Sequence, residues 1–313
     1  MSERTLSNSA TATSESAPTS ESVSSLSTSV ATLKGTVCDP HDFPTLSAAF
    51  SKKKFADSTL IVTISHGETV DSIFPNWLKT AYPKDGRQPF VIGDLNMPSK
   101  LPRRPRDHYA TDGPLTMHGK TVAAIIGTEL ASASSRWKQR KPAVIYSAPE
   151  MRCVETAKEL AEKMGVKIRV EPALCDWRMF AERGAHEHWL SVKELHALKY
   201  NVDTKYKPTL EWGNIPLREK PAEYATRLIN AYECITKTNP GAPVIVVAHP
   251  TTIFMTEDGR WSLDKHLVRI DKQIGTCEVS GIEVNAKGEV THRQIVNPFT
   301  RNLHDARELQ RLR

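Results

Sequence analysis

The feature that most constrains the fold of this chain is an alternation of short apolar segments with amphipathic ones beyond residue 56. Four runs rich in β-branched residues have the length of buried strands: 58–65, 142–147, 167–171 and 243–249. Between them, apolar residues recur at helical spacing over 116–131, 149–164 and 221–236. Strands that are apolar throughout and alternate with helices predict an α/β fold, with a mostly parallel sheet covered by helices on both faces.

The ends of these segments carry signals of their own. In the helix over 149–164, Ser147 is placed to cap the start and Gly165 to end it. Two further strands, 276–285 and 289–297, predict a closing hairpin that turns at 286–288. We therefore expect a three-layer αβα domain with a helical or loop insertion before the last parallel strand and a C-terminal hairpin.

The first part of the chain has a different composition. Residues 1–35 include 11 Ser and 6 Thr and few large apolar side chains. Such a segment buries too little apolar surface to offset the entropy lost on ordering. We predict a disordered, Ser/Thr-rich leader over residues 1–55, followed by one domain over 56–313.

Composition excludes several classes of protein. No apolar run approaches the roughly 18 residues that span a bilayer, and no apolar core of a secretory signal follows the start. The five cysteines are scattered and never form a CxxC pair, which argues against a disulfide scaffold and a cysteine-type zinc site. These features predict a cytoplasmic protein without a membrane partner, with the nucleus not excluded. The net charge of +6 suits an anionic ligand, but no nucleic-acid-binding motif accompanies it.

Polar side chains that can perform chemistry follow the predicted strands. His66 follows the first strand, Arg152 lies just beyond the second, Glu171 ends the third and His249 ends the fourth. The carboxyl ends of parallel strands meet at one edge of a sheet, where ligands bind. A single histidine after a strand is usually structural, but two histidines, an arginine and a glutamate at one edge indicate a candidate site.

The segments that carry these residues resemble the histidine phosphatase (phosphoglycerate-mutase-like) superfamily. The resemblance begins with Ser-His-Gly-Glu at 65–68, Ser-Ala-Pro-x-x-Arg-Cys-Val-x-Thr-Ala at 147–157 and Ala-His-Pro-Thr-Thr at 248–252. Further matches at 66–74, 95–104, 169–172 and 201–204 are similar to one branch of that superfamily. The branch contains the ubiquitin-associated and SH3 domain (suppressor of T-cell receptor signalling) phosphatases and the ecdysteroid-phosphate phosphatases. The resemblance covers about residues 58 to 300.

This resemblance implies phosphomonoester hydrolysis through a phosphohistidine. His66 would attack phosphorus, Glu171 would protonate the leaving oxygen, and His249 and Arg152 would bind the phosphoryl oxygens. It implies no metal and no cofactor. The expected partner is a phosphorylated small molecule or a phosphoprotein, and because members of the branch form dimers, a homodimer is expected.

The first loop departs from the family pattern, which has Arg-His-Gly-Glu-Arg. Here Ser65 and Thr69 stand where the two arginines are expected, so each offers one neutral donor to phosphate instead of a charged fork. Arg103 and Arg104, in a basic loop, are candidates to compensate. Two hypotheses follow: a weakened phosphatase, or a catalytically dead pseudophosphatase that binds phosphorylated ligands or acts as a scaffold.

Other mechanisms fit the sequence less well. A cysteine-type tyrosine phosphatase needs Cys-x5-Arg, and no cysteine here has Arg six positions later. The triplet 186–188 (His-Glu-His) lacks further ligands at helical spacing, so we expect His186 and His188 to lie on a pocket wall or the surface and not at a metal. Trp177 and Trp189 are expected to pack in the core or in the insertion. The sequence leaves the substrate open.

Overall fold

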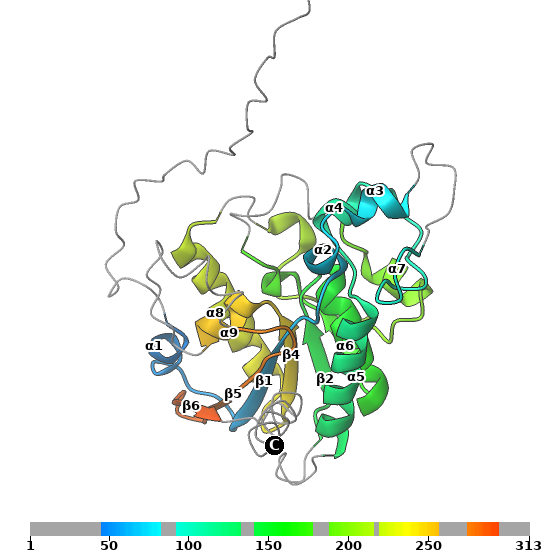
Figure 1. The fold of residues 1–313 in the computed structure, drawn as a ribbon. Helices are drawn as coiled ribbons and strands as arrows, with labels where there is room; N and C mark the ends of the chain where they lie inside the picture. The colour runs from blue at the N-terminus through cyan, green and yellow to red at the C-terminus, as the bar shows by residue number, and fades with distance from the viewer. Residues whose placement is uncertain are drawn as a thin grey trace, which may run out of the picture. The chain divides into compact units, whose positions relative to one another are not determined.

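A computed structural model describes residues 45–82, 92–132, 141–177, 188–215, 219–256 and 274–293 (Figure 1). The strands are β1 (Thr59–Ser65), β2 (Val144–Ser147), β3 (Lys167–Val170), β4 (Val244–Ala248), β5 (Val279–Val284) and β6 (Val290–Arg293). The helices are α1 (Leu46–Phe50), α2 (Val70–Ile73), α3 (Trp77–Ala81), α4 (His108–Thr111), α5 (Met117–Ser132), α6 (Met151–Met164), η1 (Pro172–Leu174), α7 (Val192–Ala197), η3 (Trp212–Asn214), α8 (Pro221–Thr238) and α9 (Pro250–Thr256). Among the described residues, no helix has both the length and the hydropathy needed to cross a membrane.

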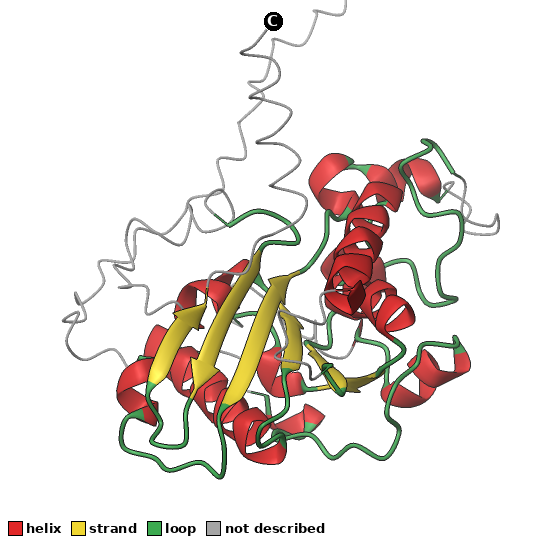
Figure 2. Ribbon diagram, turned by 90° about the horizontal axis from the view of Figure 1, so that it is seen from below, coloured by secondary structure: helices red, strands yellow, loops and turns green. Residues whose placement is uncertain are grey.

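The strands form one six-stranded sheet in the order β3-β2-β4-β1-β5-β6. The first four are mutually parallel, whereas β5 and β6 run antiparallel to their neighbours and form the predicted hairpin. Helices lie on both faces of the sheet (Figure 2). The predicted α/β architecture is therefore confirmed, and the carboxyl ends of β1, β2, β3 and β4 share one edge.

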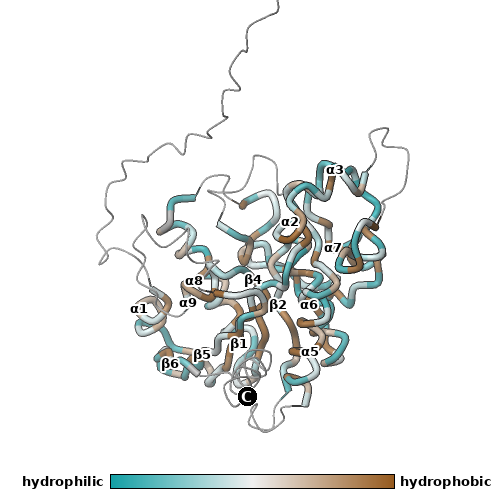
Figure 3. The backbone as a smooth tube through the Cα atoms, viewed as in Figure 1, coloured by the Kyte–Doolittle hydropathy of each residue, from teal (hydrophilic) through white to brown (hydrophobic). Residues whose placement is uncertain are grey.

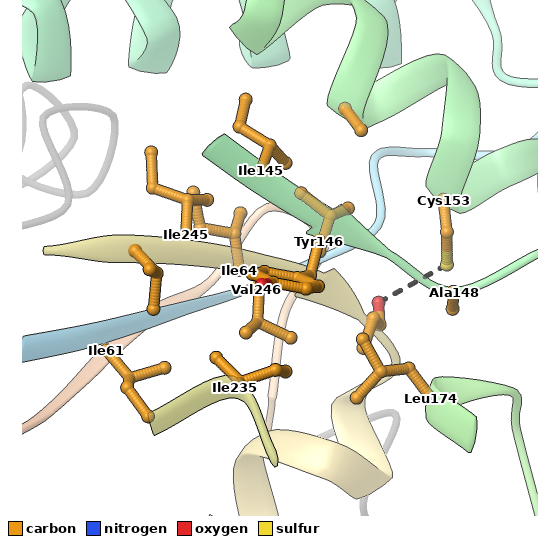
Figure 4. Packing of buried hydrophobic residues seen from close by; sticks show 14 of the residues in the cluster. Ile61, Ile64, Ile145, Tyr146, Ala148, Cys153, Leu174, Ile235, Ile245 and Val246 are labelled. Atoms are coloured by element: carbon orange, nitrogen blue, oxygen red, sulfur yellow. Dashed lines mark hydrogen bonds between the residues drawn. The ribbon is translucent and has the colours of Figure 1, made fainter. Parts of the chain in front are cut away.

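The two helical layers make different contacts with the sheet. On one face α5 packs along α6, and α6 contacts β2, β3 and β4; α1 and α8 lie on the other face (Figure 1). The strands are the most apolar part of this region (Figure 3). Ile61, Ile64, Ile145 and Ile245 are fully buried in the resulting core (Figure 4).

Helix α6 follows its sequence signals at one end only. It ends at Gly165, whose backbone is left-handed with φ +68°, as predicted from the glycine. The predicted cap is wrong, because Ser147 is still part of β2 and its hydroxyl donates to the carbonyl of Ala148. The helix starts at Met151, after Glu150. The strand therefore keeps Ser147 from reaching the helix, and Glu150 lies at the helix start instead.

The folded region begins before the predicted boundary at residue 56. Residues 45–55 include α1, and Leu46, Phe50 and Phe55 are buried in the main core. The hairpin turn fits against this segment at Gly288, where a Cβ would lie 2.0 Å from the carbonyl oxygen of Phe50. Three large apolar side chains thus attach residues 45–55 to the domain. The prediction missed this because the composition was averaged over the whole Ser/Thr-rich region. The predicted leader up to residue 44 lies outside the described residues.

Candidate active site

The two histidines of the site end adjacent strands. β1 and β4 pair in parallel with Ser65 opposite Ala248, so the next residue of each, His66 and His249, emerges at the same level. The backbone N–H of His66 donates to the carbonyl of Ala248 (2.9 Å). The imidazole centroids lie 5.4 Å apart with the rings at 71°, edge to face. The sheet register therefore brings together two side chains that are 183 positions apart in the sequence.

The loop after β1 fixes His66 through close backbone packing. Gly67 lies against Gly119 of α5, and a Cβ on Gly119 would come within 2.4 Å of the Glu68 carbonyl oxygen. His66 Nδ1 lies 3.0 Å from the carbonyl oxygen of Gly67, which can only accept, so Nδ1 carries a proton. Burial, with the charges of Arg152 and His249, lowers the pKa of His66 to about 3. The ring is thus neutral, with a free lone pair on Nε2.

Arg152 brings a cation to the same place. It sits in the first turn of α6 and its Nη2 lies 3.5 Å from Asp176 Oδ2. Burial lowers the pKa of Arg152, but Glu150 and Asp176 outweigh it and raise the pKa above its ordinary value. Within the described part of the chain, Arg152 Nε and His249 Nδ1 are buried without a hydrogen-bond partner. Two donors that face a common site and have no partner suit a bound anion.

Two carboxylates that were not predicted accompany these cations. Glu150 Oε2 lies 3.1 Å from His249 Nε2, and Asp176 Oδ2 lies 3.6 Å from His249 Nδ1. The backbone N–H of Asp176 donates to Glu150 Oε1, which joins the two loops. Burial lowers the pKa of His249, but Asp176, Cys153 and Glu150 raise it well above its ordinary value. A protonated His249 and Arg152 therefore face two acids.

The predicted acid, Glu171, is held elsewhere. Its side chain accepts from the backbone N–H groups of Ala173 and Thr209 and from the hydroxyl of Tyr206, and it is fully buried. Its carboxylate thereby anchors the 206–209 segment. Asp176, five residues later, is the carboxylate beside Arg152 and His249. Asp176 also follows β3, but the Arg-Val-Glu-Pro context at 169–172 favoured Glu171 in the sequence.

Ser65 and Thr69, which stand in place of the first-loop arginines, take part in the frame of the loop. Ser65 Oγ donates to the carbonyl of Gly275 and accepts from the N–H of Glu278, so it is used on the hairpin side of the sheet. Thr69 is buried at the start of α2 and its backbone bridges to Leu115. Both hydroxyl residues therefore belong to the frame of the loop.

The basic loop contributes packing to the domain. Arg103 is exposed, whereas Arg104 donates to Asp112 Oδ2 and to the carbonyl of His188 and stacks on the ring of Tyr109. His188 Nδ1 lies 2.7 Å from Thr111 Oγ1, and the ring of His188 stacks on that of His108. These contacts tie the loop to the insertion. His186 lies outside the described residues.

The tryptophans behave as predicted. Trp177 is buried in the main core and donates from its indole N–H to the carbonyl of Glu219. Trp189 is buried in a smaller cluster with Cys175 and Ile215. Both rings support the walls of the insertion and leave the anion site to the histidines and Arg152.

The family model described as "Histidine phosphatase superfamily (branch 1)" matches residues 103–296. The chain therefore belongs to the histidine phosphatase superfamily, as the motifs predicted. Among curated proteins, human ubiquitin-associated and SH3 domain-containing protein A is 30% identical over 202 residues, which cover 62% of this chain and 30% of that protein. The ecdysteroid-phosphate phosphatase of Drosophila melanogaster is 30% identical over 206 residues, 63% of this chain and 26% of that protein. The chain matches about a third or less of the length of these relatives.

A solved structure supports the same fold. The crystal structure of the ecdysone phosphate phosphatase from Bombyx mori in complex with tungstate aligns with a TM-score of 0.62 and 23% identity. The alignment covers 76% of this chain and 92% of that one. At this identity the likeness establishes the phosphoglycerate-mutase-like fold, and the chemistry of this chain has to be argued from its own residues.

Proposed function

We propose that this protein hydrolyses phosphomonoesters slowly, through a phosphohistidine on His66. The observation that carries the proposal is the pairing of His66 and His249 at a centroid distance of 5.4 Å, with Arg152 and its free Nε beside them. Nδ1 of His66 is committed to the Gly67 carbonyl, so the lone pair of Nε2 is available for attack. A neutral imidazole facing two cationic donors is the arrangement that an attack on a phosphate ester requires.

The reaction takes two steps with Asp176 in place of the predicted Glu171. His66 Nε2 bonds to phosphorus while the ester P–O bond breaks, and the Asp176 carboxyl group gives its proton to the leaving oxygen. Water then attacks the phosphohistidine, loses its proton to Asp176 and releases phosphate with His66 restored. Desolvation raises the pKa of Asp176, but His249 and Arg152 outweigh it and lower the pKa in the free protein. Asp176 therefore gains its proton when a phosphate anion offsets those charges.

We propose that the rate is weak because the site has lost positive charge. The two arginines of the family pattern are absent, and Ser65 and Thr69 are used in the frame of the loop. Glu150 and Asp176 balance Arg152 and protonated His249, so these four groups carry no net charge. Removal of one donor to a developing oxyanion costs about 10²- to 10³-fold in kcat, and two such losses act here.

A second function is favoured by the same balance of charge. A site that carries no net charge, with two donors that lack a hydrogen-bond partner among the described residues, can bind a phosphate group without stabilising the transition state further. The protein would then act as a pseudophosphatase that binds phosphorylated ligands or serves as a scaffold. Its ligand in either case is a phosphomonoester, on a small molecule as the name of the ecdysteroid-phosphate phosphatase suggests, or on a protein.

The two functions are separated by turnover and by binding. Purified protein is assayed on 4-nitrophenyl phosphate beside His66→Ala, Arg152→Ala and, as a control, His196→Ala, whose ring is exposed on α7. The phosphatase hypothesis predicts turnover and acid-labile protein-bound phosphate that disappear in His66→Ala and persist in His196→Ala. Equal turnover by the wild type and His66→Ala would rule that hypothesis out. Tungstate binding that is lost in Arg152→Ala would then support the binding protein.

The homodimer implied by the family branch is a separate proposal. It rests on the resemblance alone and is tested by sedimentation of the purified full chain.

A further inference from the structure

Around Nε2 of His249 lies a cluster of three different metal-ligand types. Glu150 and Cys153 come from the start of α6, three positions apart, and His249 comes from the end of β4. All three side chains are buried, and the carboxylate, thiol and imidazole atoms lie within 4.8 Å of one another. In the proposed phosphoryl transfer Glu150 only balances charge, and Cys153 takes no part.

The distances in this cluster fit a bound ion. His249 Nε2 lies 3.1 Å from Glu150 Oε2 and 3.5 Å from Cys153 Sγ. A tetrahedral zinc ion, with bonds of about 2.0–2.3 Å, places nitrogen and oxygen ligands roughly 3.3 Å apart and nitrogen and sulfur ligands roughly 3.6 Å apart. The two observed separations are therefore close to those of a zinc site before any movement of the side chains.

Hydrogen bonds within the protein do not satisfy every polar atom of this cluster. Glu150 Oε1 accepts from the backbone N–H of Asp176, which fixes the carboxylate. Glu150 Oε2, in contrast, is a buried oxygen that lacks a hydrogen-bond partner among the described residues, although His249 Nε2 is 3.1 Å away. The Cys153 thiol donates to the carbonyl of Ala248 at 3.5 Å and lies at the same distance from His249 Nε2 (Figure 4). A buried carboxylate oxygen without a hydrogen-bond donor is costly, and a cation between the three groups would satisfy it.

We propose that Glu150 Oε2, Cys153 Sγ and His249 Nε2 bind a borderline-soft divalent metal ion, with Zn²⁺ as the preferred ion. A mixed oxygen, sulfur and nitrogen donor set selects zinc or cobalt over magnesium and calcium, which prefer oxygen ligands. Binding releases the thiol proton and any proton on Nε2 to solvent, and the carboxylate and thiolate neutralise the two positive charges. The family resemblance implied no metal, and the three ligands come from two distant segments of the sequence.

The proposed ion is compatible with the proposed function. Three protein ligands leave a fourth position for water, as in zinc sites that are not purely structural. With Nε2 on the metal, the proton of the His249 ring is held on Nδ1, the atom that faces Arg152 and Asp176. His249 would then donate to a phosphoryl oxygen from Nδ1 as a neutral, metal-bound ring, and the ion would supply the positive charge that the imidazolium carries without it.

The test is a titration of the purified full chain, freed of metal by a chelator, with Co²⁺ and then with Zn²⁺. Thiolate-bound tetrahedral cobalt gives a near-ultraviolet charge-transfer band and strong visible bands. We expect one equivalent of Co²⁺ to produce both and Zn²⁺ to abolish them. The variants Cys153→Ser and Glu150→Gln keep the size of each side chain, and Cys234→Ser is the control because Cys234 lies half-buried on α8, away from the cluster.

The expected pattern is specific to the three ligands. Cys153→Ser should lose the charge-transfer band. Loss of a residue that only supports a metal ligand costs roughly 10- to 100-fold in metal affinity, so loss of a ligand in either variant should weaken Zn²⁺ binding by at least that factor. Cys234→Ser should bind as the wild type does. The proposal is wrong if wild-type protein shows no charge-transfer band, or if Cys153→Ser matches the wild type. Either result is read without a phosphatase assay, and the wild-type spectrum decides the matter even if a variant fails to fold.

Discussion

Two carboxylates that follow β3 have opposite surroundings, although they are five residues apart. Glu171 is fully buried and accepts three hydrogen bonds, two of them from the 206–209 segment. The Asp176 side chain is 40% exposed, and its Oδ2 faces Arg152 at 3.5 Å and His249 at 3.6 Å. Glu171 has both oxygens occupied by fixed donors. Asp176 has only Oδ1 held in this way, by the N–H of Trp177 and the hydroxyl of Thr251, while Oδ2 lies against the two cations. The difference separates an anchor from a group that can exchange a proton.

The strongest way to break this comparison is the substitution Asp176→Asn. If Asp176 is the general acid, its loss should lower kcat by about 10²- to 10⁴-fold with a leaving group that needs a proton. Phenyl phosphate has such a leaving group, whereas 4-nitrophenolate departs without protonation, so the loss should be smaller with 4-nitrophenyl phosphate. Steady-state rates with the two esters measure the difference. An equal loss with both esters would show that Asp176 only positions Arg152.

Asp112, a third carboxylate, differs from both Glu171 and Asp176 because it is fully buried and paired with a cation, Arg104. Asp112 is fully buried, accepts from Arg104 and holds the backbone N–H of Met151, just before Arg152. Removal of one partner of a buried ion pair typically costs about 3–5 kcal/mol, so Arg104→Met should lower the free energy of unfolding by that amount at pH 7. Urea unfolding measures it, and Arg103→Met, one residue away on an exposed side chain, is the matched control.

The effect of Arg104→Met should depend on pH in a known direction. Burial, opposed by Arg104, raises the pKa of Asp112 to about 6, and removal of Arg104 raises it further. The folded state then binds a proton that the unfolded state releases above about pH 4, so stability rises as pH falls through the folded pKa. The deficit of the variant should therefore be larger at pH 8 than at pH 5. A deficit independent of pH would mean that the lost contacts of Arg104 with Tyr109 and the His188 carbonyl dominate.

The fold was predictable because its signals are local. The strands around Ile61, Ile145 and Val246 are continuous apolar runs, and Gly165 ends α6 because glycine tolerates a left-handed backbone. The short helix with Leu46 and Phe50 was missed, since five residues give too little periodicity to register. Its stability comes from tertiary packing against α8 and the hairpin, which the sequence does not display.

Only the site residues that directly follow the ends of parallel strands could be predicted from the sequence. His66 and His249 follow adjacent parallel strands, and Arg152 follows the strand beside them, so their convergence was foreseeable from the pattern. The roles of Glu171 and Asp176 depend on donors supplied from residues 206–209 and 249, which no local pattern reveals. The same limit hid Glu150, whose importance arises from the position of His249.

Glu171→Gln tests the anchor directly and should have a moderate effect. The amide keeps one acceptor oxygen but turns its NH2 group toward either the N–H of Ala173 or the donors of Tyr206 and Thr209. It therefore removes hydrogen bonds to a charged group, each worth about 1.5–3 kcal/mol. We expect the free energy of unfolding to fall by about 2–3 kcal/mol and the rate per folded molecule to stay within twofold. Thermal unfolding and the phenyl phosphate assay report the two quantities. A hundredfold loss of rate with unchanged stability would restore Glu171 as the acid.

The smallest expected effect comes from Tyr206→Phe, which removes a single donor to Glu171 and leaves the ring. The phenol lies 2.6 Å from Glu171 Oε2, and the aromatic ring remains to pack against Tyr146 and the guanidinium of Arg169. Because Thr209 N–H and Ala173 N–H still hold the carboxylate, stability should fall by only about 1–2 kcal/mol. In Glu171→Gln the same substitution should cost less, since the charged acceptor is already gone, and the double-mutant cycle measures that coupling. Additive losses would show that Tyr206 contributes packing and that Glu171 is held by the backbone donors alone.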